Sequence, residues 1–386
     1  MRSIGAVVLV FVCLLLHQAV QEVKKNDKVS VPAWVQENKS LRSAEIPQED
    51  YAYLRQWVDQ HAKPADQYMI DLFKRYQVVI FGESHNVKEY KDFIIGLIPR
   101  LYREAGVRCI GWEFSRYSDN ERLNKLVTAE KFDSEGALDF ARDQLAHEWN
   151  SKEHWDIIEA VWRLNHSLPR DQEKLRLIGL DMNLDMPGVM VALKSLAEDS
   201  PERKAMTSEL LKRDRAMADN AAREIVERGK KGLLFVGRSH DFTHYEFPPD
   251  TNFGREIMGN LLHKRYGDRV FQVWPGPWGM SFLEKIMEGK ADRLFGFDLF
   301  DSPFANIKSP KEFSDAPEVP MQRIARGFVY FGPAAALHRN TAIKGFVTDE
   351  MFRKHKHYYE VDFGRSFNSA GEVDAFLQEH RFPAPG

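Results

Sequence analysis

The chain has 386 residues, of which 43% are hydrophobic and 29% are charged, so it is long enough to bury a large core in one elaborated domain or two smaller ones. Its formal net charge is -3, with acidic and basic residues interspersed, which excludes the strongly basic surface that nucleic acid or an anionic membrane would favour. A small molecule or a peptide is therefore the predicted partner.

The first 20 residues have the layout of a secretory signal. Arg2 precedes an apolar run over residues 4–16 that is shorter than a bilayer span. The pattern predicts export, either to a periplasm or by secretion. A retained membrane anchor is the alternative, because the small-residue cleavage pattern is poor. Residues 21–49 are polar and lack periodicity, so they are expected to form an irregular extension.

Strands and helices alternate along residues 50–386, which are predicted to form the folded domain. Apolar runs with the length of buried strands lie at 77–81, 108–112, 175–180, 232–236, 269–274 and 328–331. Their alternation with helical segments predicts the α/β class, with a mostly parallel central sheet and helices on both faces. A charged stretch at about 120–165 is expected to form an inserted helical subdomain.

The first strand ends in Gly82, followed by Glu83 and His85. Glycine lets the chain turn sharply, so an acid and an imidazole project near one point. The pair can position a water molecule for general-base attack, or it can offer an oxygen and a nitrogen ligand to a metal. Taken alone, a loop cap and a surface histidine are the more common explanation.

The second and fourth strands also end in polar residues. Glu113 stands between two aromatic residues, where an unpaired carboxylate would be costly to bury, so it needs a partner or a function. Pairing with Arg116 is the structural alternative. His240 closes the fourth strand and brings Arg238 and Tyr245 with it.

Three further features carry weaker signals. Asp181, after the third strand, is expected either to bind a histidine or to cap a helix. Arg213 and Asn220 share one face of a helix, and that pattern alone favours a solvated surface. His147 and His154 are expected to be surface histidines, with metal ligation as the alternative.

Because the carboxyl ends of parallel strands meet at one edge of a sheet, a site is predicted from Glu83, His85, Glu113 and His240. The sequence contains no Gly-Xaa-Ser-Xaa-Gly elbow, Walker loop, His-Glu-Xaa-Xaa-His or paired Cys-Xaa-Xaa-Cys motif. The common serine-hydrolase, nucleotide-binding and zinc signatures are therefore excluded.

Several motifs resemble the superfamily that joins erythromycin esterases, ChaN-like haem-binding lipoproteins and Tiki-type metallopeptidases. The resemblance covers roughly residues 78–244. It is carried by the segments 82–85 (Gly-Glu-Ser-His), 112–114 (Trp-Glu-Phe), 178–182 (Ile-Gly-Leu-Asp-Met), 213–220 (Arg-Asp-Arg-Ala-Met-Ala-Asp-Asn) and 236–240 (Val-Gly-Arg-Ser-His).

By this resemblance, His85 would be the base that activates water, Glu83 and Glu113 would orient it, and His240 would assist the reacting carbonyl. Asp181, Arg213, Asn220, Arg238 and Tyr245 would bind substrate or support these groups. One residue separates Glu83 from His85, whereas esterases place two there, and this spacing resembles the ChaN branch.

Three functions are compatible with these motifs, and no cofactor is fixed by them. The leading one is an exported hydrolase that uses a Glu/His site to activate water against an ester or amide. The second is a haem- or iron-binding protein in which a histidine or Tyr245 is the iron ligand. The third is a metallopeptidase in which Glu83, His85, Glu113 and His240 hold manganese, cobalt, iron or zinc.

Overall fold

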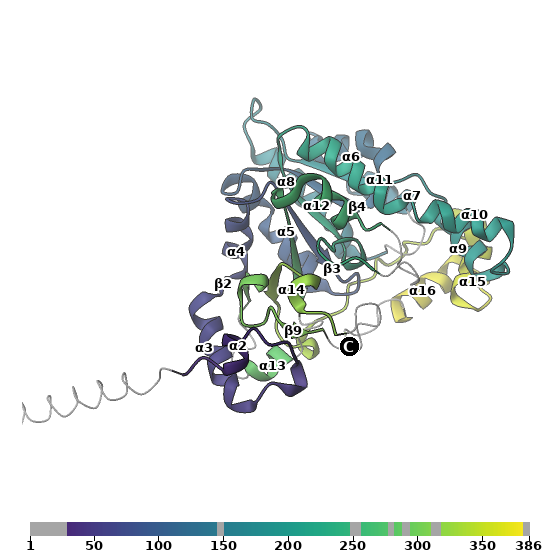
Figure 1. Cartoon of the computed structure of the whole chain (residues 1–386). Helices are drawn as coiled ribbons and strands as arrows, with labels where there is room; N and C mark the ends of the chain where they lie inside the picture. Colours follow the sequence, from purple (N-terminus) through teal and green to yellow (C-terminus); the bar gives the residue numbers. More distant parts are fainter. Residues whose placement is uncertain are drawn as a thin grey trace, which may run out of the picture.

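The structure is a computed structural model and describes residues 29–144, 150–247, 256–276, 282–287, 294–309 and 318–380 (Figure 1). The predicted signal over residues 1–20 lies outside these ranges, as does His147. Within them, no helix is both long and apolar enough for a membrane crossing.

A central sheet organises the described residues, in the strand order β2-β8-β10-β7-β3-β6-β4-β5. Its strands are β2 (Lys63–Pro64), β3 (Val78–Glu83), β4 (Val107–Arg116), β5 (Arg176–Asp181), β6 (Lys231–Gly237), β7 (Val270–Gly276), β8 (Phe295–Asp298) and β10 (Gly327–Tyr330). All neighbours from β10 to β5 pair in parallel, whereas β8 runs antiparallel to β10 and to β2. The predicted α/β fold with a mostly parallel sheet is confirmed, and the antiparallel edge was not predicted.

Helices surround this sheet. They are α2 (Ala33–Gln36), α3 (Tyr51–His61), α4 (Ala65–Leu72), α5 (Lys88–Arg103), α6 (Asn120–Thr128), α7 (Ser134–Gln144), α8 (Lys152–Ser167), α9 (Met186–Ser195), α10 (Pro201–Leu210), α11 (Arg213–Ala221), α12 (Met258–Tyr266), α13 (Phe282–Ile286), α14 (Met321–Ile324), α15 (Asp349–Phe363) and α16 (Ala370–His380). Helices α9, α10, α15 and α16 gather at the right of Figure 1.

Alternate side chains of β3 enter different parts of the core, as the period of two in a strand requires. Val79 and Phe81 pack in one cluster with α4, α5, α6 and α8, whereas Val78 and Ile80 pack with α11 and α12. Both faces of the central strands are therefore buried, which explains their continuous apolar sequences.

The segment predicted as an insertion, about residues 120–165, contains α6, α7 and α8 between the adjacent strands β4 and β5. Its apolar side chains, among them Leu123, Phe140 and Trp155, belong to the same core cluster as β3 and β4. These helices therefore form the connection that a parallel strand pair requires, and they share its core.

Part of the segment predicted as an irregular extension is packed. Residues 29–49 contain α2 and the short strand β1 (Leu41–Arg42), which pairs with β9 (Ile307–Lys308). Trp34 and Ile46 are buried in a second cluster beside α3 and α13, seen at the lower left of Figure 1. Two apolar anchors in a polar segment leave no periodic signal in the sequence, which is why this packing was not foreseen.

Candidate functional site

Glu83 is the last residue of β3, and its carboxylate is buried at the carboxyl edge of the sheet. Oε2 accepts a hydrogen bond of 2.5 Å from Nζ of Lys91 on α5. Oε1 accepts one from Nδ1 of His85, two residues further along the chain. Burial opposes the charge of Glu83, but Lys91 and His85 outweigh it and hold the pKa of the carboxyl well below its usual range. Glu83 is therefore an ionised anchor for the imidazole.

His85 is the exposed member of this pair, with 42% of its side chain accessible. A methyl group built on Gly237 would lie 2.9 Å from Nε2 of His85 and 3.1 Å from Oε2 of Glu113. The Nε2 side of the imidazole and the Glu113 carboxylate thus border the same small space, which only a glycine at position 237 leaves open.

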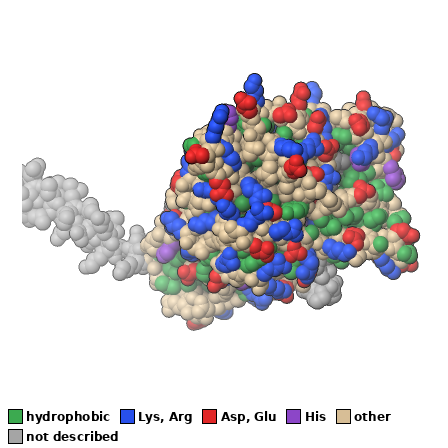
Figure 2. Space-filling model, turned by 90° about the horizontal axis from the view of Figure 1, so that it is seen from above, with side chains coloured by type: hydrophobic (Ala, Val, Ile, Leu, Met, Phe, Trp, Pro, Cys, Tyr) green, Lys and Arg blue, Asp and Glu red, His purple; other side chains and the backbone are tan. Residues whose placement is uncertain are grey.

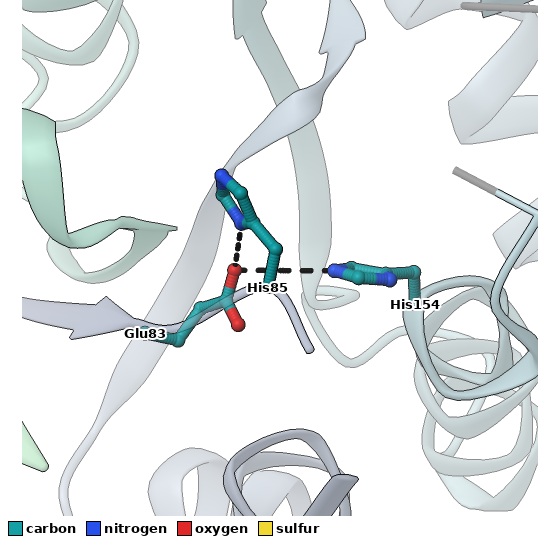
Figure 3. Close-up of side chains that lie close together, drawn as sticks. All are labelled: Glu83, His85 and His154. Carbon is teal, nitrogen blue, oxygen red and sulfur yellow. Dashed lines mark hydrogen bonds and ion pairs between the residues drawn. The ribbon is translucent and has the colours of Figure 1, made fainter. Parts of the chain in front are cut away.

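His154 also approaches Glu83, from α8. Its Nε2 lies 3.9 Å from Oε1 of Glu83, so the carboxylate stands between two imidazoles (Figure 3). The His154 ring is completely buried against Phe114, and burial together with Lys91 lowers its pKa to about 4. The expectation of a surface histidine is wrong, because α8 turns this side chain toward the sheet.

Glu113 lies near the end of β4, and its carboxylate is held by an arginine from a distant helix. Oε1 accepts a 2.9 Å hydrogen bond from Nη2 of Arg213, and Oε2 accepts one from the backbone N–H of Gly237. Burial opposes the charge, but His240 and Arg213 lower the pKa of Glu113 well below its usual range. The suggested pairing of Glu113 with Arg116 does not occur, since Arg116 binds Asp119 instead.

Arg213 links two strand ends. Its Nε donates to both oxygens of Asp181 at 2.9 Å, while Nη2 reaches Glu113. The sequence suggested that Asp181 would bind a histidine or cap a helix. In the structure, its carboxylate binds Arg213 instead. The helix face that carries Arg213 and Asn220 was expected to be solvated, but it packs toward the sheet, and Asn220 donates to the carbonyl of Leu180 at 2.8 Å.

His240 is buried between two carboxylates. Nδ1 lies 2.8 Å from Oδ1 of Asp214, and Nε2 lies 3.3 Å from Oε1 of Glu113. Burial lowers the pKa of His240, but the two carboxylates outweigh it and raise the value to about 9. Nη1 of Arg213 also lies 3.3 Å from Nε2 of His240, but the raised pKa favours the protonated imidazole at neutral pH.

This raised pKa predicts how stability depends on pH. The folded protein keeps a proton on His240 that the unfolded chain loses above its ordinary pKa of about 6.5, so the stabilisation is complete below that pH and lost as pH rises to about 9. The loss should be on the order of 3 kcal/mol. Chemical denaturation at a series of pH values should show this decline in the wild type and a flatter one in His240→Gln.

The variant is needed for comparison because burial also raises the pKa of Asp241, to about 8, and this adds a decline of the same sign at lower pH. A wild-type decline above pH 8 that persists unchanged in His240→Gln would contradict the assignment of the proton to His240.

Two other predicted residues pack against aromatic side chains. Tyr245 is buried in the second core cluster against Phe242 and Phe247. Arg238 is buried with its guanidinium 5.3 Å from the ring of Trp274. The charge of Glu83 acts on Arg238 and favours the protonated guanidinium, against the burial that lowers its pKa. The suggested part of Arg238 and Tyr245 in substrate binding stays a prediction.

The predicted metal ligands are not gathered as one set. Glu113 and His240 lie 3.3 Å apart. Glu113 also binds Arg213, and His240 also binds Asp214, so a cation at this place would stand beside the Arg213 guanidinium. Among the described residues, the compact group of ligand-type atoms is Glu83, His85 and His154, within 4.8 Å of one another.

This second group also fits a divalent cation poorly. The Lys91 ammonium already neutralises Glu83, and a metal at Oε1 would lie close to that buried positive charge. Tyr245 fits poorly as a haem ligand, because it is packed among aromatic core residues, whereas a histidine as the iron ligand stays a prediction. The donor set suits proton transfer at His85 better than metal binding.

Comparison with known proteins was made at the level of sequence and of structure. No protein-family model matches the chain, and no curated protein matches it in sequence. A protein from Bacillus cereus is similar in structure, with a TM-score of 0.55, 14% identity, and coverage of 76% of this chain and 99% of that one. A succinoglycan biosynthesis protein is similar to the same degree, with a TM-score of 0.55, 12% identity and coverage of 76% and 99%. The chain shares its fold with these two proteins.

Two further similar structures come from families that the sequence resembles. One is a mutant of the erythromycin esterase EreC in its open conformation, with a TM-score of 0.46, 12% identity and coverage of 68% and 92%. The other is ChaN of Campylobacter jejuni with cofacially bound heme, with a TM-score of 0.37, 13% identity and coverage of 56% and 92%.

Proposed function

We propose that this protein is a hydrolase in which His85 activates a water molecule for attack on the carbonyl carbon of an ester or an amide. The observation that carries the proposal is the anchored imidazole. Nδ1 of His85 donates to the ionised, buried Glu83, while the opposite side of the half-exposed ring borders the space beside Glu113. This is the arrangement that a general base requires.

In the proposed reaction, Nε2 of His85 takes a proton from water as the oxygen attacks the carbonyl carbon. The tetrahedral intermediate then collapses: the bond from this carbon to the ester oxygen or amide nitrogen breaks, and the His85 imidazolium gives its proton to the leaving alcohol or amine. Glu83 stabilises the imidazolium that forms, as a carboxylate behind a catalytic histidine does. Glu113, fixed by Arg213 and by the Gly237 N–H, orients the water from the other side. The protonated His240 supplies positive charge near the carbonyl oxygen as it becomes an oxyanion.

The surroundings favour a polar substrate. A hollow of about 770 Å³ adjoins the ends of β4 and β5 and is lined mainly by charged and amide side chains, among them Arg116, Asp143, Gln144 and Asn183. A narrower one that shares Arg116 and Gln144 with it reaches Phe114 and Asp181, next to the site. We propose a small polar molecule or a peptide as substrate.

We also propose that the protein is exported and that it does not bind nucleic acid. Support for export is the apolar run over residues 4–16. On the face shown in Figure 2, basic and acidic side chains are interspersed, which offers no basic surface for a phosphate backbone there.

Chelation is the direct test against a metal-dependent mechanism. Because Lys91 already neutralises Glu83, exhaustive treatment with EDTA or 1,10-phenanthroline should leave kcat unchanged, within about twofold, against a library of esters and peptide amides. Elemental analysis and an absorption spectrum of the purified protein accompany the assay. Turnover that is lost on chelation and restored by a divalent ion would overturn the metal-free mechanism. A Soret band in the absorption spectrum would support the haem-binding alternative.

A further inference from the structure

Lys91 is a buried charge on the core side of α5. It lies on one stripe of the helix with Ile94, Ile98 and Leu101, and all four side chains are essentially inaccessible. A lysine in such a position needs partners for its ammonium group, because an unpaired buried charge costs several kcal/mol.

The three N–H donors of the ammonium have three acceptors. Nζ lies 2.5 Å from Oε2 of Glu83, 2.8 Å from the carbonyl oxygen of Ser84 and 3.1 Å from that of Val87. The three acceptors belong to residues on both sides of His85 in the sequence. The Lys91 ammonium therefore links the Glu83 carboxylate to the loop that carries the imidazole.

We infer that Lys91 is a positioning residue that fixes His85 in its working orientation by clamping Glu83 and the backbone of residues 84–87. The inference rests on the proposed function, since it assigns a task within that site. Stability alone does not explain the pair, because a buried ion pair is often no more stabilising than apolar residues of similar volume. Glu83 also needs a cation that leaves Oε1 to His85, and Lys91 binds only the other oxygen.

Lys91→Met tests this, since methionine fills a similar volume without a charge. We expect kcat to fall about 100-fold with KM nearly unchanged, because a small displacement of the base costs rate rather than substrate affinity. Lys88→Met is the matched control. Lys88 lies on the same helix with 37% of its side chain exposed, and its ammonium binds Asp92 at 2.7 Å and lies 3.4 Å from Oε1 of Glu153, so it does not contact Glu83 or its loop through these pairs. The control should keep wild-type kcat.

Hydrogen exchange gives a readout that does not depend on turnover. The N–H of Val87 donates to the carbonyl of Ser84 at 3.1 Å within the clamped loop, and we expect the peptide covering residues 84–87 to exchange at least about tenfold faster in Lys91→Met. Should Lys91→Met not fold, Lys91→Gln keeps two donors, removes the charge, and is expected to show the same losses.

The possible outcomes distinguish the positioning role of Lys91 from the proposed hydrolase function. Native exchange together with kcat within about twofold of wild type in a folded Lys91 variant would overturn the positioning role. Faster exchange in Lys91→Met but not in Lys88→Met supports the clamp even if no ester or amide is hydrolysed by the wild type, a result that would overturn only the proposed function.

Discussion

Replacing His85 by glutamine is expected to lower kcat about a thousandfold, because the variant loses the group that takes the proton from water. Glutamine can still donate a hydrogen bond to Glu83, and 42% of the His85 side chain is exposed, so the fold should persist with little change in thermal stability. The measurement is kcat and KM on the best substrate of an ester and amide library, together with a thermal unfolding curve.

His338 offers a matched control for this experiment. It too pairs with a carboxylate, since Nδ1 lies 2.6 Å from Oε1 of Glu89, but 78% of its side chain is exposed. His338→Gln should keep wild-type kcat. If His85→Gln retained more than about a tenth of the wild-type kcat, His85 would not be the general base.

Arg213→Met is expected to destabilise the fold by about 3–5 kcal/mol, because it leaves the buried carboxylates of Glu113 and Asp181 without their shared counter-charge. Asp181 and Glu113 outweigh the effect of burial and raise the pKa of Arg213, so the arginine is firmly charged in the folded state. Turnover should be lost as well, because Glu113 would no longer be fixed. Denaturant unfolding with linear extrapolation measures the loss of stability.

Arg215→Met is the control within the same helix. Arg215 pairs with Glu256 at the surface, with about half of each side chain exposed, so its removal should cost less than about 1 kcal/mol. Equal free energies of unfolding for the two variants would show that the Arg213 network does not support the fold.

The central strands could be predicted because both of their faces are buried. Val78 to Phe81 is continuously apolar for that reason, and the parallel order followed from the helices between strands. The antiparallel edge of the sheet was harder to predict from the sequence. Strand β8 has four residues and β2 has two, and their antiparallel pairing depends on contacts far apart in the sequence.

The structure brings the four predicted residues Glu83, His85, Glu113 and His240 to one edge of the sheet, because each lies in the last part of a parallel strand or just beyond it. Of their partners, Arg213 was among the predicted residues, whereas Lys91 and Asp214, which also lie on helices, were missed. Lys91 gave a usable signal, as a lysine on the apolar stripe of α5, and so did Asp214, which shares a stripe with Ala218 and Ala221.

His154 and Tyr245 show the limit of such patterns. His154 stands next to Trp155 in a charged helical segment, and nothing in the spacing shows that it faces Glu83. Tyr245 follows His240 closely in the sequence, but the loop turns it into the second core cluster. Chain direction after a strand end is set by tertiary packing, which local sequence does not encode.

Hydrolysis in water enriched with oxygen-18 tests the central claim most directly. The wild-type protein is incubated with the library of esters and peptide amides, and the acid products are analysed by mass spectrometry. If water activated at His85 attacks the carbonyl carbon, one oxygen-18 atom appears in the acid product with the wild type and is nearly absent with His85→Gln. Labelled product formed equally well by both proteins, or no product from any ester or amide, would contradict the account.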